Sequence, residues 1–151
     1  MSLSHTHNLL TQSHWEGADL RAILEHETEA YGQTRVSLVG PPVSLEPATV
    51  LSLGMIFHEM ATNAAKYGAL HTPEGRVLID WALADQRAPK LRLTWREIGG
   101  PKVTAPDRRG FGSRLIERNI RHDLAGEIDL VYAPEGLIAE LTVPLDRTAA
   151  R

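Results

Sequence analysis

Residues 55–67 read MIFHEMATNAAKY, and this stretch decides the interpretation of the chain. Its apolar residues recur with helical spacing, and its polar residues Glu59, Asn63 and Lys66 are four and three residues apart. At 3.6 residues per turn, these three side chains lie along one stripe of the helix. A carboxylate, a carboxamide and an ammonium group in one line on an otherwise apolar helix indicate a ligand site.

Each polar side chain of this stripe has a chemistry that suits a nucleotide. Asn63 offers an amide oxygen that can ligate Mg²⁺ without adding negative charge beside phosphates. Glu59 can position a water molecule or accept a proton from an attacking group. One turn later, Lys66 can contact a phosphate, and Tyr67 can contact a base or a ribose. The alternative is the solvated polar face of an ordinary amphipathic helix.

His58 stands directly before Glu59, as in the helical motif of zinc proteases. That motif needs a second histidine four residues after the first, and the chain has Thr62 there, so the zinc interpretation fails. His58 is then either a packed, hydrogen-bonded histidine or a group that orients its neighbours. We keep it as a candidate catalytic residue together with Glu59.

A second motif, WREIGG at residues 95–100, ends a predicted strand. A carboxylate at the end of a strand, here Glu97, can accept a hydrogen bond from an exocyclic amine such as that of adenine. Gly99 lets the backbone approach a base closely or turn sharply. Taken alone, the motif is more typical of an ordinary strand that ends in a Gly-Gly turn.

A third motif, RRGFGSR at residues 108–114, precedes a predicted helix. The free N–H groups at the start of a helix bind anions, and glycines remove side chains that would block a phosphate. The motif lacks Gly-Lys-Ser/Thr and a third glycine, so it is neither a Walker loop nor a dinucleotide fingerprint. The candidate phosphate-binding residues are Arg108, Arg109, Gly110, Gly112 and Ser113.

The helix after this motif carries a basic stripe formed by Arg114, Arg118 and Arg121. Such a stripe is either a solvated helix face or a docking surface for an acidic partner. The spacing of these residues fits both interpretations equally.

The composition describes one globular domain. The chain has 151 residues, 42% of them hydrophobic and 23% charged, which is enough for a single core. A formal charge of −3 gives no electrostatic reason to expect nucleic acid or direct membrane contact. The absence of cysteine excludes disulfides and thiolate sites and suits a cytoplasmic location. No apolar run approaches the roughly 20 residues that cross a bilayer.

Helical and strand-like patterns succeed one another along the chain, with most strands in the second half. We therefore expect an α/β (α+β) layered sandwich with one mixed, mostly antiparallel sheet. The predicted helices span about residues 19–30, 47–68 and 112–122, and the predicted strands span 35–39, 43–45, 76–84, 90–97, 128–132 and 137–143.

The three motifs together resemble the ATP-binding catalytic domain of bacterial sensor histidine kinases, in the superfamily of gyrase, heat-shock chaperone, histidine kinase and MutL. HEMATNAAKYGAL resembles the N box, and WREIGG and RRGFGSRLIER resemble the two glycine boxes. His58 before Glu59, and Trp95 with Glu97, match the signature of the HWE subfamily. The resemblance covers about residues 7–145 and implies a Bergerat-type fold, a two-layer sandwich with about three helices.

The resemblance also implies roles for individual residues and two cofactors, ATP and Mg²⁺. Glu59 positions or deprotonates the attacking group, Asn63 binds Mg²⁺, and Lys66 and Tyr67 line the phosphate and nucleoside side of the pocket. Glu97 stands where most histidine kinases have an aspartate that contacts the adenine amino group. The glycines implied in base and phosphate binding are Gly99, Gly110 and Gly112.

The acceptor histidine of this family, on a dimerising helical hairpin, has no counterpart in the chain. We expect residues 18–146 to form the catalytic domain, residues 1–17 to be a linker from that hairpin, and residues 147–151 to be a tail. The implied partners are the hairpin, which receives the γ-phosphoryl group, and a response regulator, with a homodimeric full-length kinase. The alternatives are an ATPase that uses water, or a non-catalytic nucleotide-binding or regulatory module.

Overall fold

The computed structural model describes residues 18–32, 34–84, 88–101 and 111–145, with the backbone alone at residues 111–113. The predicted tails therefore lie outside the described residues. The elements in chain order are β1 (Ala18–Asp19), α2 (Leu20–Thr28), η1 (Glu29–Tyr31), β2 (Val36–Val39), β3 (Ser44–Leu45), α3 (Pro47–Lys66), η2 (Ala69–His71), β4 (Arg76–Ala84), β5 (Lys90–Ile98), α4 (Phe111–Arg118), the π-helical turn η4 (Asn119–Asp123), β6 (Glu127–Ala133) and β7 (Gly136–Pro144).

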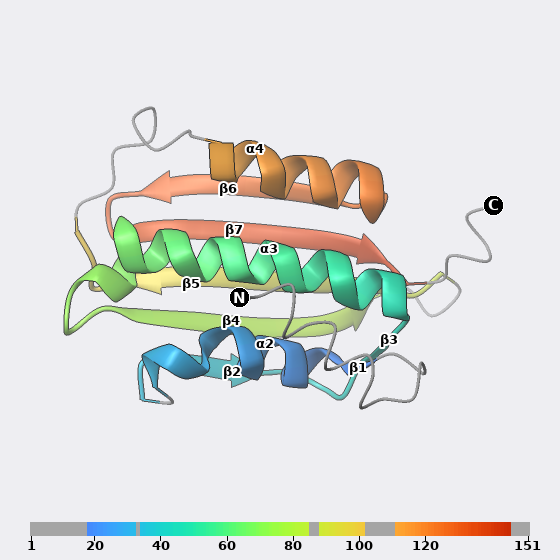
Figure 1. The fold of residues 1–151 in the computed structure, drawn as a ribbon, viewed down its shortest axis with the longest axis horizontal. Coiled ribbons are helices and arrows are strands. Elements are labelled where there is room, and N and C mark those ends of the chain that lie inside the picture. The colour runs from blue at the N-terminus through green and yellow to red at the C-terminus, as the bar shows by residue number, and fades with distance from the viewer. Residues whose placement is uncertain (1–17, 33, 85–87, 102–110, 146–151) are drawn as a thin grey trace.

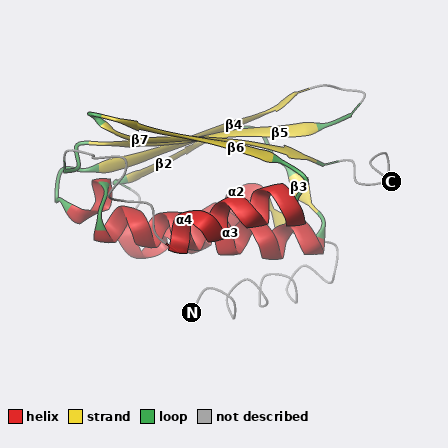
Figure 2. Ribbon diagram, turned by 90° about the horizontal axis from the view of Figure 1, so that it is seen from above, coloured by secondary structure: helices red, strands yellow, loops and turns green. Residues whose placement is uncertain are grey.

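One five-stranded sheet forms the first layer, and the helices form the second. The strand order is β2-β4-β5-β7-β6, in which β2 and β4 are parallel and the other neighbours are antiparallel. Figure 2 shows α2, α3 and α4 together on one face of this sheet. The predicted two-layer sandwich with a mixed, mostly antiparallel sheet is confirmed. The short strand β3 pairs with β1 instead of joining this sheet.

The core lies between the sheet and the helices. Alternate residues of a strand face the same side, so β5 presents Leu91, Leu93, Trp95 and Glu97 to the helix layer. The central helix α3 buries Phe57 and Met60 against them, and both are almost inaccessible. Glu59 and Asn63 lie next to this buried face of α3 and are half-buried. The polar stripe of the helix is therefore at the edge of the core.

The helix ends follow from local capping residues. Asp19 caps α2, because its Oδ2 accepts a hydrogen bond from the Arg21 N–H at 3.1 Å, and Gly32 ends the following turn with a φ of 89°. Pro47 begins α3, as predicted.

The predicted helix to about residue 122 is present, but its last turn is not α-helical. The α-helix ends at Arg118, and a π-helical turn follows in which the Leu124 N–H donates to the Asn119 carbonyl at 3.1 Å. This wider turn buries both Asn119 and Ile120. Within the described residues, no helix is both long and apolar enough to cross a membrane.

Candidate functional site

Two of the three sequence motifs meet at one end of the sheet, and α4 begins on the same side. Figure 1 shows the C-terminal end of α3 beside the C-terminal end of β5, at the left of the view. We call residues 63–75 and 95–100 the site end. Asn63 lies five residues before Gly68, and Gly68 lies directly against the Glu97 carboxylate. The N-box stripe and the end of β5 are therefore contiguous.

The stripe on α3 lies at the border between core and surface. Glu59 and Asn63 are half-buried, while Lys66 and Tyr67 are exposed, Tyr67 by 52%. Within the described part of the chain, the side chains of Glu59 and Asn63 have no hydrogen-bond or ion-pair partner. An unpartnered carboxylate and amide at the edge of the core are available to a ligand.

His58 faces α2 and not the stripe that carries Glu59. Its Nδ1 lies 3.1 Å from the Oε1 of Glu27 on α2, and the Glu27 side chain is only 3% exposed against 46% for His58. Successive residues of a helix point about 100° apart, so Glu59 faces a different side of α3. The structure therefore places His58 in the contact between α2 and α3, and does not bring the two catalytic candidates together.

Glu97 is buried at the base of the site end and is 4% exposed. Its Oε2 accepts a hydrogen bond from the Trp95 indole Nε1–H, and its Oε1 accepts one from the Ala69 N–H, both at 3.0 Å. Burial raises the pKa of the Glu97 carboxyl above its ordinary value, and the hydrogen bonds from Ala69 and Trp95 oppose that rise.

The segment after α3, Gly68 to Gly75, is held tightly against Glu97. The Arg35 guanidinium donates to the carbonyls of Ala69 (3.4 Å) and Gly75 (3.1 Å), and also to that of Thr72. A Cβ on Gly68 would lie 2.1 Å from the Glu97 Oε1, so any side chain there would displace that carboxylate oxygen. Both backbone groups of Ala69, its N–H and its carbonyl, are thus hydrogen-bonded to side chains.

Sequence reasoning missed Arg35 and did not assign Gly68. Arg35 lies 40 residues before Gly75, the partner that it reaches, so no local pattern marks it. Gly68 was inside the quoted HEMATNAAKYGAL motif, and a glycine directly after a buried helix was the available signal for close packing.

Gly99 turns the chain at the edge of the site end. It has a φ of 74°, and a Cβ there would lie 3.0 Å from the Glu74 carbonyl oxygen. The Thr72 hydroxyl donates to the Gly99 carbonyl at 2.9 Å. The structure thus gives Gly99 a turn beside residues 72–75, and its role in making room for a base stays a prediction.

The phosphate-loop candidates cannot be placed with the rest. Arg108, Arg109 and Gly110 lie outside the described residues, and only the backbone of Gly112 and Ser113 is described, in the first turn of α4. Their predicted roles stay predictions.

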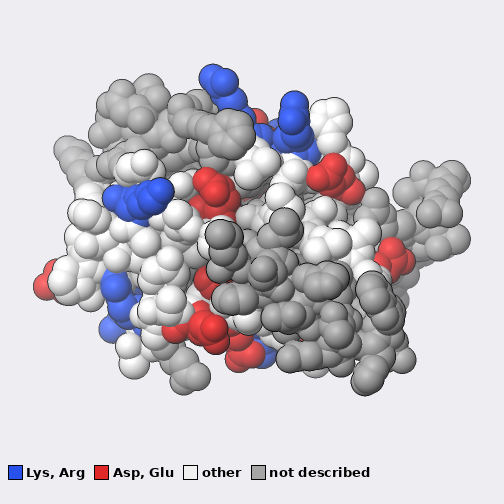
Figure 3. Space-filling view, in the orientation of Figure 1, with Lys and Arg blue, Asp and Glu red and all other residues white. Residues whose placement is uncertain are grey.

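The basic stripe of α4 is at the surface. Arg114 and Arg118 are exposed, and Arg121 donates to the Ile128 carbonyl at 3.3 Å. Figure 3 shows basic side chains along the edge where α4 lies and acidic ones in front of α2. The exposed acids of α2 and η1 include Glu25 and Glu29.

The protein groups suit a cation that is shared with phosphates. Among the described residues, no three histidine or acidic side chains cluster as a metal site. Mg²⁺ often binds proteins through one or two oxygen ligands and completes its shell with substrate phosphates and water. The half-buried amide of Asn63 fits such a single-ligand arrangement.

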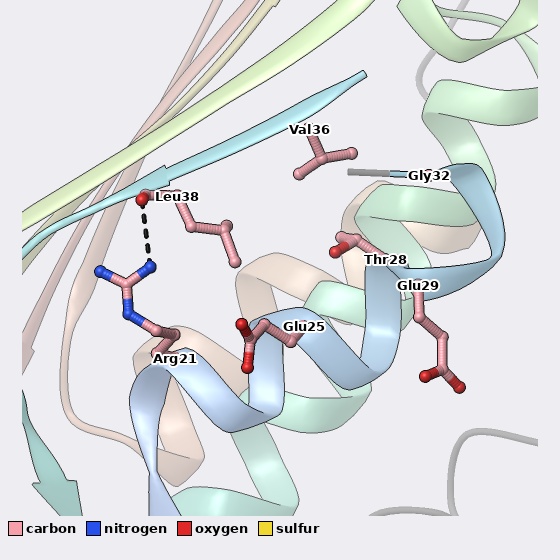
Figure 4. Close-up of a pocket in the computed structure, with 7 residues that line it drawn as sticks. All are labelled: Arg21, Glu25, Thr28, Glu29, Gly32, Val36 and Leu38. Atoms are coloured by element: carbon pink, nitrogen blue, oxygen red, sulfur yellow. Dashed lines mark hydrogen bonds between the residues drawn. The ribbon is translucent and has the colours of Figure 1, made fainter. Parts of the chain in front are cut away.

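A separate cavity of about 540 Å³ lies between α2 and β2. Figure 4 shows Arg21 and Glu25 on one wall, with the Arg21 guanidinium donating to the Leu38 carbonyl at 3.1 Å. None of the predicted site residues lines this cavity, so it is distinct from the site end.

Sequence comparison connects the chain with one family. The HWE histidine kinase family model matches residues 1–42. A blue-light-activated histidine kinase of Brucella ovis is 32% identical over 148 residues, which cover 95% of this chain. The aligned part is 30% of that protein, so the chain spans about a third of the length of this relative.

Structure comparison gives the same fold. The histidine kinase domain of the Erythrobacter litoralis blue-light activated histidine kinase matches with a TM-score of 0.64 at 19% identity, over 87% of this chain and 61% of that one. The catalytic domain of histidine kinase ThkA matches with a TM-score of 0.65 at 13% identity, over 83% of this chain and 92% of that one. At such identities the matches establish the fold, which is that of histidine kinase catalytic domains.

Proposed function

Because this chain is 32% identical to a blue-light-activated histidine kinase along 95% of its length and matches the HWE family model at residues 1–42, we propose that it is the ATP-binding catalytic domain of a two-component sensor histidine kinase. The reaction that we propose transfers the γ-phosphoryl group of ATP to a histidine on a separate dimerisation hairpin, for relay to a response regulator. The full-length kinase would be a homodimer that holds this domain in the cytoplasm. The observation that carries this proposal is the contiguity of the α3 stripe with buried Glu97.

Glu97 is suited to recognise the adenine base. A carboxylate has about four lone-pair positions, and the hydrogen bonds from Trp95 and Ala69 occupy two of them. The remaining positions can accept a hydrogen bond from an exocyclic amino group, directly or through a water molecule. Because the group is almost fully buried, such a bond would be formed in a site that excludes most bulk water.

The α3 stripe is suited to the phosphate side of the same ligand. Asn63 would hold Mg²⁺ through its amide oxygen, and Lys66 would contact a phosphate. When bound, Mg²⁺ supplies positive charge that neutralises the phosphate oxygens. Glu59 would orient the attacking imidazole or accept its proton. Phosphoryl transfer depends mainly on positioning and charge neutralisation, which these side chains can provide.

The experiment that tests the proposal measures ATP and ADP affinity by calorimetry with and without Mg²⁺. We expect Asn63→Ala to lower the Mg²⁺-dependent affinity about tenfold or more, because it removes the protein ligand of the cation. The control is Ser52→Ala, a half-buried position on the same helix, about 16 Å from Asn63 at 1.5 Å per residue. Far-UV circular dichroism establishes that both variants are folded.

An Asn63→Ala variant with unchanged affinity would remove Asn63 from the ligand role. Wild-type protein without any nucleotide affinity would favour a non-catalytic module. Steady release of inorganic phosphate by the isolated chain would favour the ATPase that uses water.

A further inference from the structure

The Trp95 indole and the Glu97 carboxylate form a hydrogen-bonded pair on the helix-facing side of β5. The two residues are two positions apart on one strand, so their side chains face the same side, and the Nε1–Oε2 distance is 3.0 Å. We propose that Trp95 is a positioning residue of the nucleotide site, whose indole N–H holds the Glu97 carboxylate in the orientation that accepts the adenine amino group. This inference rests on the function proposed above.

Trp95 is fixed in place by its surroundings. It is completely inaccessible to solvent, and its neighbours across the sheet are Ile79 on β4 and Ala139 on β7. An indole N–H is a donor without acceptor capacity, and a buried donor that loses its partner is unfavourable. The buried Trp95 ring has no room to rotate, so its N–H cannot follow the carboxylate into another Glu97 rotamer. The indole therefore constrains the orientation of the carboxylate.

A second donor, on a different element, holds the other oxygen of Glu97. The Ala69 N–H donates to Oε1, and the carbonyl of the same residue accepts from Arg35. Because Gly68 has no side chain, nothing displaces Oε1 from this position. Trp95 and Ala69 thus each hold one oxygen of the Glu97 carboxylate, from two different elements. The lone pairs of these oxygens that accept no hydrogen bond therefore have a fixed orientation.

The same two donors oppose the effect of burial on Glu97. Burial raises the pKa of this carboxyl, and the bonds from Ala69 and Trp95 lower it. Among the described residues, no charged side chain hydrogen-bonds or ion-pairs with Glu97. The charged or titratable residues of the surrounding segments include Arg35, Glu59, Lys66, Tyr67, His71, Glu74, Arg76, Arg96 and Glu135. Loss of the indole donor would therefore favour the protonated carboxyl, which cannot accept as strongly.

The test compares Trp95→Phe with a matched control, Trp81→Phe. Trp81 is a second buried tryptophan on the neighbouring strand β4, and its Nε1–H donates to the Pro41 carbonyl at 2.8 Å, away from Glu97. Both variants lose one indole hydrogen bond, but only the bond of Trp95 is to an ionisable carboxylate. The Kd for Mg²⁺·ATP is measured by calorimetry between about pH 5.5 and 8.5 for the wild type and both variants.

We expect Trp95→Phe to bind about tenfold more weakly near neutral pH, the effect of one lost hydrogen bond to a charged group. Its affinity should also begin to fall at a higher pH than that of the wild type, whereas Trp81→Phe should follow the wild-type profile. A general loss of packing would not shift the pH profile.

The outcomes separate this inference from the proposed function. Wild-type protein that binds no nucleotide contradicts both. Wild-type protein that binds, with superimposable pH profiles for the two variants, contradicts this inference alone. A measurement that needs no variant follows the indole Nε1–H resonance of Trp95 by NMR in the wild type. This resonance should shift with the titration of Glu97 and with ATP, and one that responds to neither also contradicts the inference.

Discussion

The two ends of the sheet are built from the same three residue types but differ in one acceptor. At the site end, Trp95, Gly68 and Arg35 pack around the Glu97 carboxylate and the peptide of Ala69. The opposite end, which we call the Trp81 end, consists of Arg21, residues 38–41 and Trp81. There the Trp81 indole donates to Pro41, Arg21 donates to Leu38 and Gly40, and a Cβ on Gly40 would lie 2.3 Å from the indole ring.

At the Trp81 end, the acceptors of the Trp81 indole and of the Arg21 guanidinium are all backbone carbonyls. Such carbonyls carry no charge and do not titrate, so the tryptophan, the arginine and the glycine only fasten β2 to β4 and to α2. Arg21 also lies over the Trp81 ring, 5.1 Å from its centroid. At the site end the same arrangement encloses an ionisable carboxylate. The comparison teaches that both ends share the same kind of packing, and that the buried carboxylate of Glu97 distinguishes the end that we propose binds the nucleotide.

The largest expected difference between the two ends comes from their glycines. Gly68→Ala would place a Cβ 2.1 Å from a carboxylate oxygen, and Gly40→Ala would place one against the Trp81 ring. We expect each to lower the free energy of unfolding by about 1–3 kcal/mol through overpacking. Only Gly68→Ala should also abolish nucleotide binding, because it displaces Glu97. Urea denaturation and calorimetry check the two effects, and equal loss of binding in both variants would remove the distinction between the ends.

The arginines give a smaller contrast. Arg35→Lys replaces a planar fork by one ammonium group, which cannot reach the carbonyls of Ala69, Thr72 and Gly75 together. We expect a loss of about 1–2 kcal/mol in the free energy of unfolding and weaker ATP binding. Arg21→Lys should be destabilising by a similar or smaller amount with ATP affinity unchanged. An Arg21→Lys variant that weakens binding as much as Arg35→Lys would show that the two ends are not independent.

The smallest expected effect is the pH dependence that the buried acid confers. The pKa of Glu97 is raised in the folded protein above its usual 4.5, so the folded state holds this proton more tightly than the unfolded state. The free energy of unfolding should therefore fall as pH rises from about 4.5 through the folded-state pKa, and level off above it. Glu97→Gln lacks this titration. Denaturation curves of both proteins from pH 4.5 to 8 should show a slope in their difference, and parallel curves would contradict it.

The sequence predicted the fold well because its signals are local. Alternation marked β4, β5, β6 and β7 to within a residue or so, and Asp19, Gly32 and Pro47 marked helix ends. The pairing of β3 with β1 was not predictable, because a strand of two residues is too short to show a pattern that indicates its partner strand. The π-helical turn after Arg118 was missed because its sequence continues a helical period.

The residues of the candidate site could be proposed from the sequence where they are close together in the chain. The α3 stripe and Glu97 follow from short motifs, and the structure makes them contiguous through Gly68. The contacts that hold them, from Arg35 to Ala69 and from Glu27 to His58, span 34 and 31 residues and depend on tertiary packing. The phosphate-loop residues at 108–110 remain predictions.

The two hydrogen bonds to the backbone of Ala69 have a consequence for the order of folding. Ala69 joins Arg35, 34 residues earlier, to Glu97, 28 residues later, so both bonds close long loops of chain. Such contacts form only after the strands on either side have assembled. We therefore expect the segment from Gly68 to Gly75 to be among the last parts to become native during refolding. Its amide protons should acquire protection from exchange later than those of the β4–β5 hairpin.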